Sequence, residues 1–299
     1  MIDRGLILND KRVLQHIRDN YIPVAIDQAN QRRQQDAEGK FYRRIAKQGP
    51  RNDFELTTQG FYLAAASGKL LSYTNNRTPD RLLQTFERTD VQVLPEANAI
   101  SPGTIDRKFS FERPKGTAVV RVNAKVLGGF TKGLPLGAQL MQKATSRDNL
   151  WITAEEQKAL SNGQIPTHFR NRLIRFHLVD NTRGEPSMWK QGEVKSEDLA
   201  IKDGRLTGQI RLESRETGGR AYEVGVLGFL EFKGDRLSRF DIVARGTHRG
   251  RGKHTRNPPK GPFPLAITFR LADGKDIADG LAPQASRGWL DGYLMPRVK

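Results

Sequence analysis

The chain has 299 residues, a formal net charge of +17 and no cysteine. Disulfide formation and dithiol exchange are therefore excluded, because both need a thiol. A hydrophobic content of 36% with 28% charged residues favours a globular protein over a disordered one. No run approaches the roughly 20 apolar residues that span a bilayer, and the first residues lack the layout of a signal peptide.

Most of the positive charge belongs to the later part of the chain. Residues 1–100 hold 15 Lys and Arg against 12 Asp and Glu, which leaves 35 against 21 for residues 101–299. The first part thus contributes +3 and the second +14. Such a field attracts polyanions, and the alternative, that the charge serves only solubility, remains open.

The first ninety residues predict alternating helices and strands. Apolar residues at three-to-four spacing indicate a helix over Lys11–Asn20, and a nearly continuous apolar run indicates a buried strand over Tyr21–Asp27. A polar helix within 28–48 and a hairpin over Gly60–Tyr73 follow. Thr78 and Pro79 have the residue types that begin a helix.

A turn-rich stretch then separates two predicted domains. We expect an α/β domain over residues 1–94, a linker over 95–116 and an antiparallel β-rich α+β domain over 117–299. Thr153 and Glu156 form a capping box for a short helix, and a second helix is expected over 170–178. Alternating apolar residues predict strands over 117–126, 206–212, 222–232, 237–244 and 265–271.

The stretch from Arg175 to Trp189, the first cluster, is dense in residues that carry chemistry. His177 and Asp180 fit a base and its orienting carboxylate, or two ligands of a metal. Arg183 fits an anion clamp, with Glu185 as a second carboxylate. The alternative is a structural turn held by side-chain hydrogen bonds, an Arg183–Glu185 ion pair and a buried tryptophan, and the sequence does not separate the two.

The stretch from Arg245 to Gly261, the second cluster, has no acidic residue and alternates glycine with basic residues. Glycine backbone there would let amides approach a phosphate, while basic side chains supply charge. The alternative is a solvated loop. The predicted anion-binding residues are Arg245, Arg249, Arg251, Lys253 and Arg256.

Metal, cofactor and aromatic signals are weaker. His248 and His254 are six residues apart, and His168 and His177 nine apart, which matches no zinc signature. Metal content and cofactor therefore stay unknown. Phe229 and other aromatics near basic residues fit the apolar phase of their strands and are expected in the core.

Residues 11–88 resemble a thioredoxin-like domain without its Cys-x-x-Cys motif, and the hairpin with its following helix carries the resemblance. The whole chain resembles uncharacterised planctomycete-type bacterial thioredoxin-like proteins in three stretches. These are 33–39, 68–71 and 175–185. The resemblance implies a fold and a location in the cell envelope or outside the cell, but no activity.

Two functional hypotheses follow. In the first, a non-redox thioredoxin-like scaffold is joined to a basic β domain that binds an anionic ligand or polymer. In the second, the β domain is a hydrolytic or metal-assisted enzyme with His177 or His248 as base or ligand, Asp180 and Glu185 as carboxylates and Arg183 stabilising an anion. The second hypothesis requires these side chains to meet in one cleft.

Overall fold

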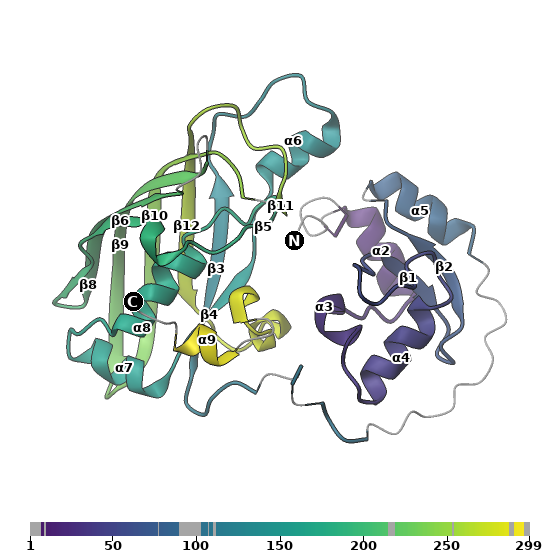
Figure 1. The fold of residues 1–299 in the computed structure, drawn as a ribbon, viewed down its shortest axis with the longest axis horizontal. Coiled ribbons are helices and arrows are strands. Elements are labelled where there is room, and N and C mark those ends of the chain that lie inside the picture. Colours follow the sequence, from purple (N-terminus) through teal and green to yellow (C-terminus); the bar gives the residue numbers. More distant parts are fainter. Residues whose placement is uncertain are drawn as a thin grey trace. The chain divides into compact units, whose positions relative to one another are not determined.

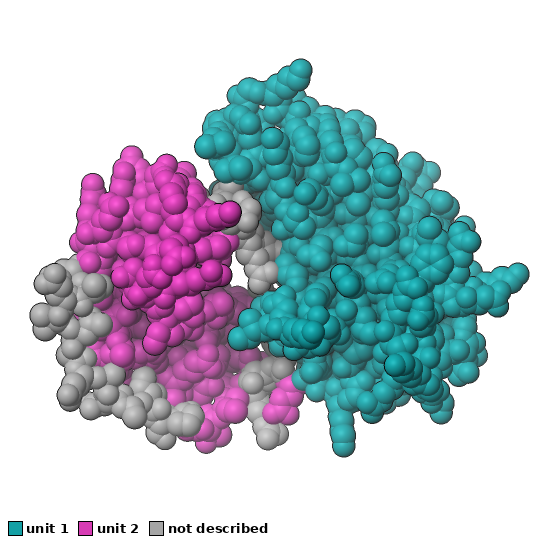
Figure 2. Space-filling view, turned by 180° about the vertical axis from the view of Figure 1, so that it is seen from behind, with its two compact units in different colours: residues 1–5, 113–299 teal, residues 6–112 magenta. Residues whose placement is uncertain are grey.

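The computed structural model describes residues 7–8, 10–76, 78–89, 103–106, 108–109, 112–214, 219–252, 254–286 and 290–295. The chain divides into two compact units (Figure 2). Residues 6–112 form the N-terminal unit, and residues 113–299 with residues 1–5 form the C-terminal unit. Within the described residues, no helix has the length and apolar character needed to cross a bilayer.

The N-terminal unit consists of short helices and one hairpin. Its elements are α2 (Lys11–Asn20), α3 (Gln28–Gln31), α4 (Ala37–Ala46), β1 (Phe61–Ala64), β2 (Leu70–Thr74) and α5 (Pro79–Glu87) (Figure 1). The predicted first helix, hairpin and helix after Thr78 are confirmed. Asp10 caps α2 by accepting from the backbone N–H groups of Arg12 and Val13. Gly68, at φ +86°, makes the hairpin turn that its lack of a Cβ permits.

The strand predicted over Tyr21–Asp27 is wrong. These residues form neither helix nor strand, and Ile22 and Val24 are 91% and 73% exposed. An apolar run becomes a buried strand only when another strand pairs with it, and β1 and β2 pair with each other. The helix expected within 28–48 is interrupted, because Asp36 accepts from Gly39 N and starts α4 anew.

The C-terminal unit combines helices with a large antiparallel sheet, as expected. The sheet has eight strands and curves into a half-barrel (Figure 1). Its strands are β3 (Ala118–Val126), β4 (Asp148–Ile152), β6 (Val194–Glu197), β7 (Ala200–Lys202), β8 (Arg205–Glu213), β9 (Ala221–Lys233), β10 (Arg236–Arg249) and β12 (Phe263–Leu271). The order is β4-β3-β12-β10-β9-β8-β6, with β7 paired to β8. The sequence missed β4, β6 and β7, which are short.

The C-terminal unit also contains helices. They are α6 (Leu136–Lys143), α7 (Ala154–Ser161), α8 (Thr167–Asn171), the π-helix η1 (Arg172–His177), the short 3₁₀ helices η2 (Gln191–Glu193), η3 (Ile277–Gly280) and η4 (Gln284–Ser286), and α9 (Leu290–Leu294). The predicted capping box at Thr153 and Glu156 starts α7. Phe169 and Leu173 join the core with inward-facing strand residues such as Phe240. The opposite sheet face carries the exposed residues of β9 and β10.

Candidate functional site

The two sequence clusters meet in a two-stranded antiparallel sheet. Strand β5 (Gly184–Glu185) pairs with β11 (His254–Thr255), so that Glu185 lies opposite His254 (Figure 1). Arg256 N also donates to the Arg183 carbonyl at 3.3 Å. Residues far apart in the sequence therefore belong to one local structure, which periodicity could not reveal.

Asp180 and Arg183, which precede β5 in the chain, form a buried polar group with His248 of β10. Arg183 is 0% exposed, forms an ion pair with Asp180 and places its guanidinium 5.4 Å from the Phe263 ring centre. The Asp180 carboxylate also accepts from Thr182 N at 3.2 Å and Thr182 Oγ1 at 2.6 Å. The exposed Glu185 lies outside this group.

His248 is held as a neutral imidazole at neutral pH. Its ring packs between those of Phe263 and Tyr222, with ring centres 5.1 and 5.6 Å away. Burial lowers the pKa of His248 to about 4; the Asp180 carboxylate opposes this shift, and Arg183 and Arg220 add to it. A base with such a pKa is a weak proton acceptor, and its burial limits contact with any substrate.

His177 belongs to a different polar group. Its Nε2 is hydrogen-bonded to Tyr293 Oη at 2.8 Å, and its Nδ1 lies 3.5 Å from Asp148 Oδ2. Burial alone would raise the pKa of Asp148, but hydrogen bonding to His177 and to backbone amides holds it below its ordinary value. Among the described residues, the partners found for His177 and for His248 are different side chains.

The His177 group attaches α9 to the π-helix η1. Arg172, at the start of η1, is buried; it pairs with Glu156, and its Nη1 donates to the Leu294 carbonyl at 2.6 Å. Its guanidinium lies 5.4 Å from the Tyr293 ring centre. Phe176 of η1 also stacks on Tyr293, with ring centres 5.7 Å apart, so three residues of η1 hold α9.

We expect Tyr293→Phe to destabilise the C-terminal unit by about 1–3 kcal/mol, because it leaves the buried Nε2 of His177 without its partner. Urea unfolding followed by tryptophan fluorescence measures this, since all three tryptophans lie beyond residue 113. Thr268→Val is the control: it removes a hydroxyl from an exposed hydrogen bond in the same unit and should change the urea midpoint much less. An unchanged urea midpoint in Tyr293→Phe would show that the contact contributes nothing.

The predicted anion-binding residues are mostly at the surface. Arg245, Arg249, Arg251 and Arg256 are exposed, and Lys253 lies outside the described residues. Arg249 is engaged by Glu213 at 2.6 Å. The other three have no carboxylate partner in the described part of the chain.

The glycine-rich loop interpretation of the second cluster needs correction at its start. Strand β10 continues to Arg249, so Arg245 and Gly246 are strand residues. A Cβ on Gly246 would lie 1.8 Å from the Glu223 carbonyl oxygen of the neighbouring strand. Gly246 therefore permits close strand packing and is not free to approach a phosphate.

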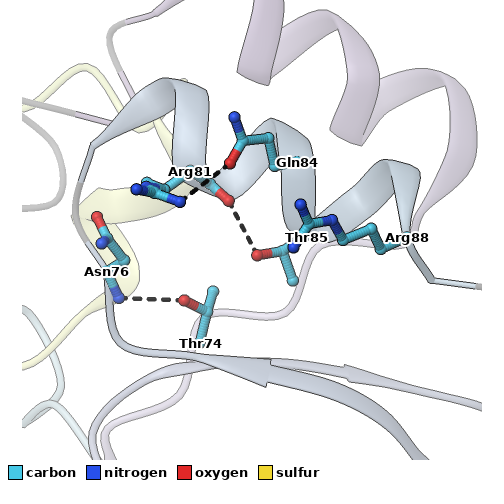
Figure 3. Close-up of a pocket in the computed structure, with 6 residues that line it drawn as sticks. All are labelled: Thr74, Asn76, Arg81, Gln84, Thr85 and Arg88. Atoms are coloured by element: carbon cyan, nitrogen blue, oxygen red, sulfur yellow. Dashed lines mark hydrogen bonds between the residues drawn. The ribbon is translucent and has the colours of Figure 1, made fainter.

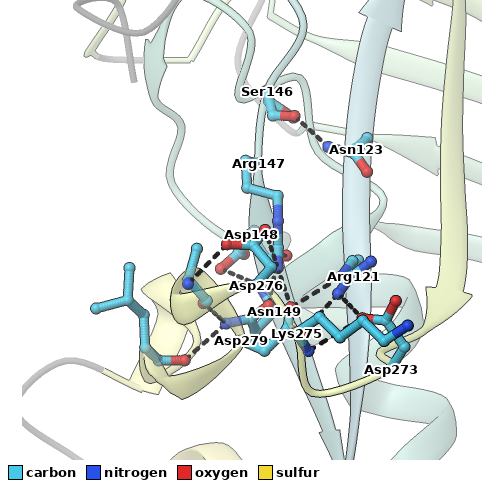
Figure 4. A network of polar contacts seen from close by, with 12 residues as sticks. Arg121, Asn123, Ser146, Arg147, Asp148, Asn149, Asp273, Lys275, Asp276 and Asp279 are labelled. Carbon is cyan, nitrogen blue, oxygen red and sulfur yellow. Dashed lines mark hydrogen bonds and ion pairs between the residues drawn. The ribbon is translucent and has the colours of Figure 1, made fainter. Parts of the chain in front are cut away.

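No metal centre is found in the part of the chain that the structure describes, where no three His, Asp or Glu side chains are grouped to hold an ion. Three carboxylates that are close together in the sequence, those of Asp273, Asp276 and Asp279, are instead paired with arginines (Figure 4). Arg121 and Arg147 contact Asp279 at 2.7 and 2.6 Å. The Arg121 hydrogen bond lowers the pKa of Asp279, so this network anchors η3 and the turn before it to β3 and to the residue that precedes β4.

Two hollows lie in the N-terminal unit. One, of about 280 Å³, is lined by Thr74, Asn76, Arg81, Gln84, Thr85 and Arg88 between β2 and α5 (Figure 3). The other, of about 660 Å³, is lined by residues 50–53, 56, 57, 73 and 75. Neither contains a residue that the sequence singled out for function.

Comparison with family models, with curated proteins and with solved structures finds no match to this chain.

Proposed function

We propose that the C-terminal unit binds an anionic ligand or polymer at the far end of β10 and the segment after it. The observation that carries the proposal is a contrast in burial. Asp180, Arg183, His177 and His248 are buried, whereas Arg245, Arg251 and Arg256 are exposed and lack a carboxylate partner among the described residues. Exposed guanidinium groups bind phosphate, sulfate or carboxylate in water-facing sites.

The buried residues Asp180 and Arg183 have a structural role in this proposal, because they hold the binding segment in place. The Asp180–Arg183 ion pair and the β5–β11 pairing fix the segment that presents Arg251 and Arg256. The hydrolytic alternative would need a substrate to reach side chains that are covered by protein. We therefore favour binding over catalysis at this place.

The expected result is heparin binding that weakens steeply with salt. The triple variant R245Q/R251Q/R256Q should bind about tenfold or more weakly at low salt, and its plot of log affinity against log salt should be shallower by about two to three. The measurement is fluorescence anisotropy with labelled heparin between low and high salt.

The matched control is K202Q/K233Q/R236Q, which removes three exposed charges at the opposite ends of the strands. It should lose much less affinity than the first triple variant. Equal losses of affinity in the two triple variants would show that only the net charge matters and not the position of the arginines. A wild-type affinity that does not change with salt would refute the proposal.

We further propose that residues 11–88 are a cysteine-free, thioredoxin-like scaffold. The order of α2, the β1–β2 hairpin and α5 supports this, while the irregular segment 21–27 departs from it. Hydrogen exchange in the full chain tests the proposal on the elements that support it. Slow exchange over β1, β2 and α5 would support a packed scaffold, and exchange there as fast as in an unfolded chain would end the thioredoxin-like interpretation.

A further inference from the structure

The outward face of the large sheet carries a cluster of exposed apolar side chains. Leu227, Phe229 and Val243 are 43%, 45% and 45% exposed. Leu227 lies directly opposite Val243 on the next strand, and Phe229 is two residues further along the same face. The three side chains therefore form one continuous apolar cluster, and the core assignment of Phe229 is wrong.

Four basic side chains, the basic ring, surround this apolar cluster. Arg205 lies opposite Phe229, and Arg245 is two residues beyond Val243. On β12, Ala266 lies opposite Arg245, and Lys125 of β3 lies opposite Ala266 on its other side. Arg270 of β12 lies opposite Asp241. None of the four has an acidic partner among the described residues.

The acidic residues of this face are largely neutralised. Arg239 contacts Asp241 at 2.7 Å and Glu231 at 2.8 Å, and its guanidinium lies 5.5 Å from the Phe229 ring centre. Glu223 lies 3.5 Å from Arg211. Because one arginine pairs with both Asp241 and Glu231, one negative charge remains beside Phe229, and the four positive charges of the basic ring outweigh it.

We propose that this face binds an anionic lipid surface, with the apolar cluster entering the headgroup region and the basic ring contacting lipid phosphates. Stable attachment to a membrane needs two signals, because a small apolar area alone gives marginal binding. Each basic side chain near an anionic leaflet adds roughly fivefold in affinity. The apolar cluster and the basic ring supply both signals on one face.

Other occupants fit this face less well. Two copies of the chain would bring the basic ring against itself, which like charges oppose. A single-stranded nucleic acid uses a row of aromatic platforms, and this cluster has one aromatic ring and two aliphatic side chains. Three apolar side chains are also few for a stable protein interface, which buries roughly 800 Å² on each partner.

Sedimentation of the full-length protein with vesicles tests the inference. We expect binding to phosphatidylcholine vesicles that contain phosphatidylglycerol and little binding to phosphatidylcholine alone. L227Q/F229Q should weaken binding about tenfold or more, and R205Q/R270Q should weaken it by a similar factor. These variants leave the loop residues Arg251 and Arg256 intact, so heparin binding by L227Q/F229Q should be retained.

The control for apolar truncation is L136Q/I277Q, which changes two highly exposed side chains elsewhere in the C-terminal unit. Its vesicle binding should equal that of the wild type, and unchanged tryptophan emission would show that each variant is folded. Wild-type protein that binds heparin but not anionic vesicles would overturn the inference and leave the polyanion proposal standing. Equal loss in L136Q/I277Q and L227Q/F229Q, or equal binding to neutral vesicles, would also overturn it.

Discussion

Acidification from pH 6.5 to pH 4 is expected to destabilise the C-terminal unit by about 3 kcal/mol through His248 alone. An unfolded histidine takes up a proton near pH 6.5, whereas burial holds the folded pKa of His248 at about 4. The unfolded state therefore binds more protons in this window, so stability is full above it and is lost as pH falls. The shift between 6.5 and 4 sets the magnitude.

His248→Phe separates this effect from other acid effects. Phenylalanine keeps an aromatic ring between Tyr222 and Phe263 but carries no titrating group. Its free energy of unfolding, from urea titrations read by tryptophan fluorescence, should change much less between pH 6.5 and pH 4 than that of the wild type. Protonation of Asp148 destabilises the folded state only at lower pH, because the pKa of Asp148 is depressed below the ordinary aspartate value. Parallel pH profiles for the two proteins would contradict the assignment to His248.

Arg183→Met is expected to destabilise the same unit by about 3–5 kcal/mol, because it leaves the buried Asp180 carboxylate without its cation. The matched control is Arg249→Met, which breaks a surface pair with Glu213 at the end of β8 and should cost less than about 1 kcal/mol. The double variant D180N/R183M should recover part of the loss, since it removes both charges. Urea midpoints compare the three variants, and a wild-type midpoint in Arg183→Met would show that the buried pair does not stabilise the fold.

Local signals predicted much of the fold. The Lys11–Asn20 helix, the Thr153–Glu156 capping box and the strands of the large sheet all depend on residues close together in the sequence. The strand prediction over Tyr21–Asp27 was wrong, because an apolar run does not reveal whether another strand is available to pair with it. The prediction that Phe229 lies in the core was wrong for another reason. Leu227, Phe229 and Leu230 place apolar residues on both sides of β9, so alternation does not indicate which side faces the core.

The candidate site was harder to predict than the fold. The sequence identified the residue types of both clusters, and the structure joins those clusters through strands of two residues each. Such short strands leave no periodic pattern to detect. Burial of His177 and His248, and exposure of Arg251 and Arg256, depend on tertiary packing that spacing alone does not encode.

The strand order also constrains how the C-terminal unit is made. Strand β3 pairs with β12, so Asn123 faces Thr268 across the ladder although nearly the whole unit separates them in the sequence. During synthesis, the β3–β4 pair and the β8–β9–β10 meander can form before β12 is made, but the edge of β3 stays open until β12 has left the ribosome. Ladders between distant segments close slowly, because much chain entropy is lost first. A nascent chain that pauses before β12 would present an unpaired edge on β3, and unpaired strand edges favour aggregation.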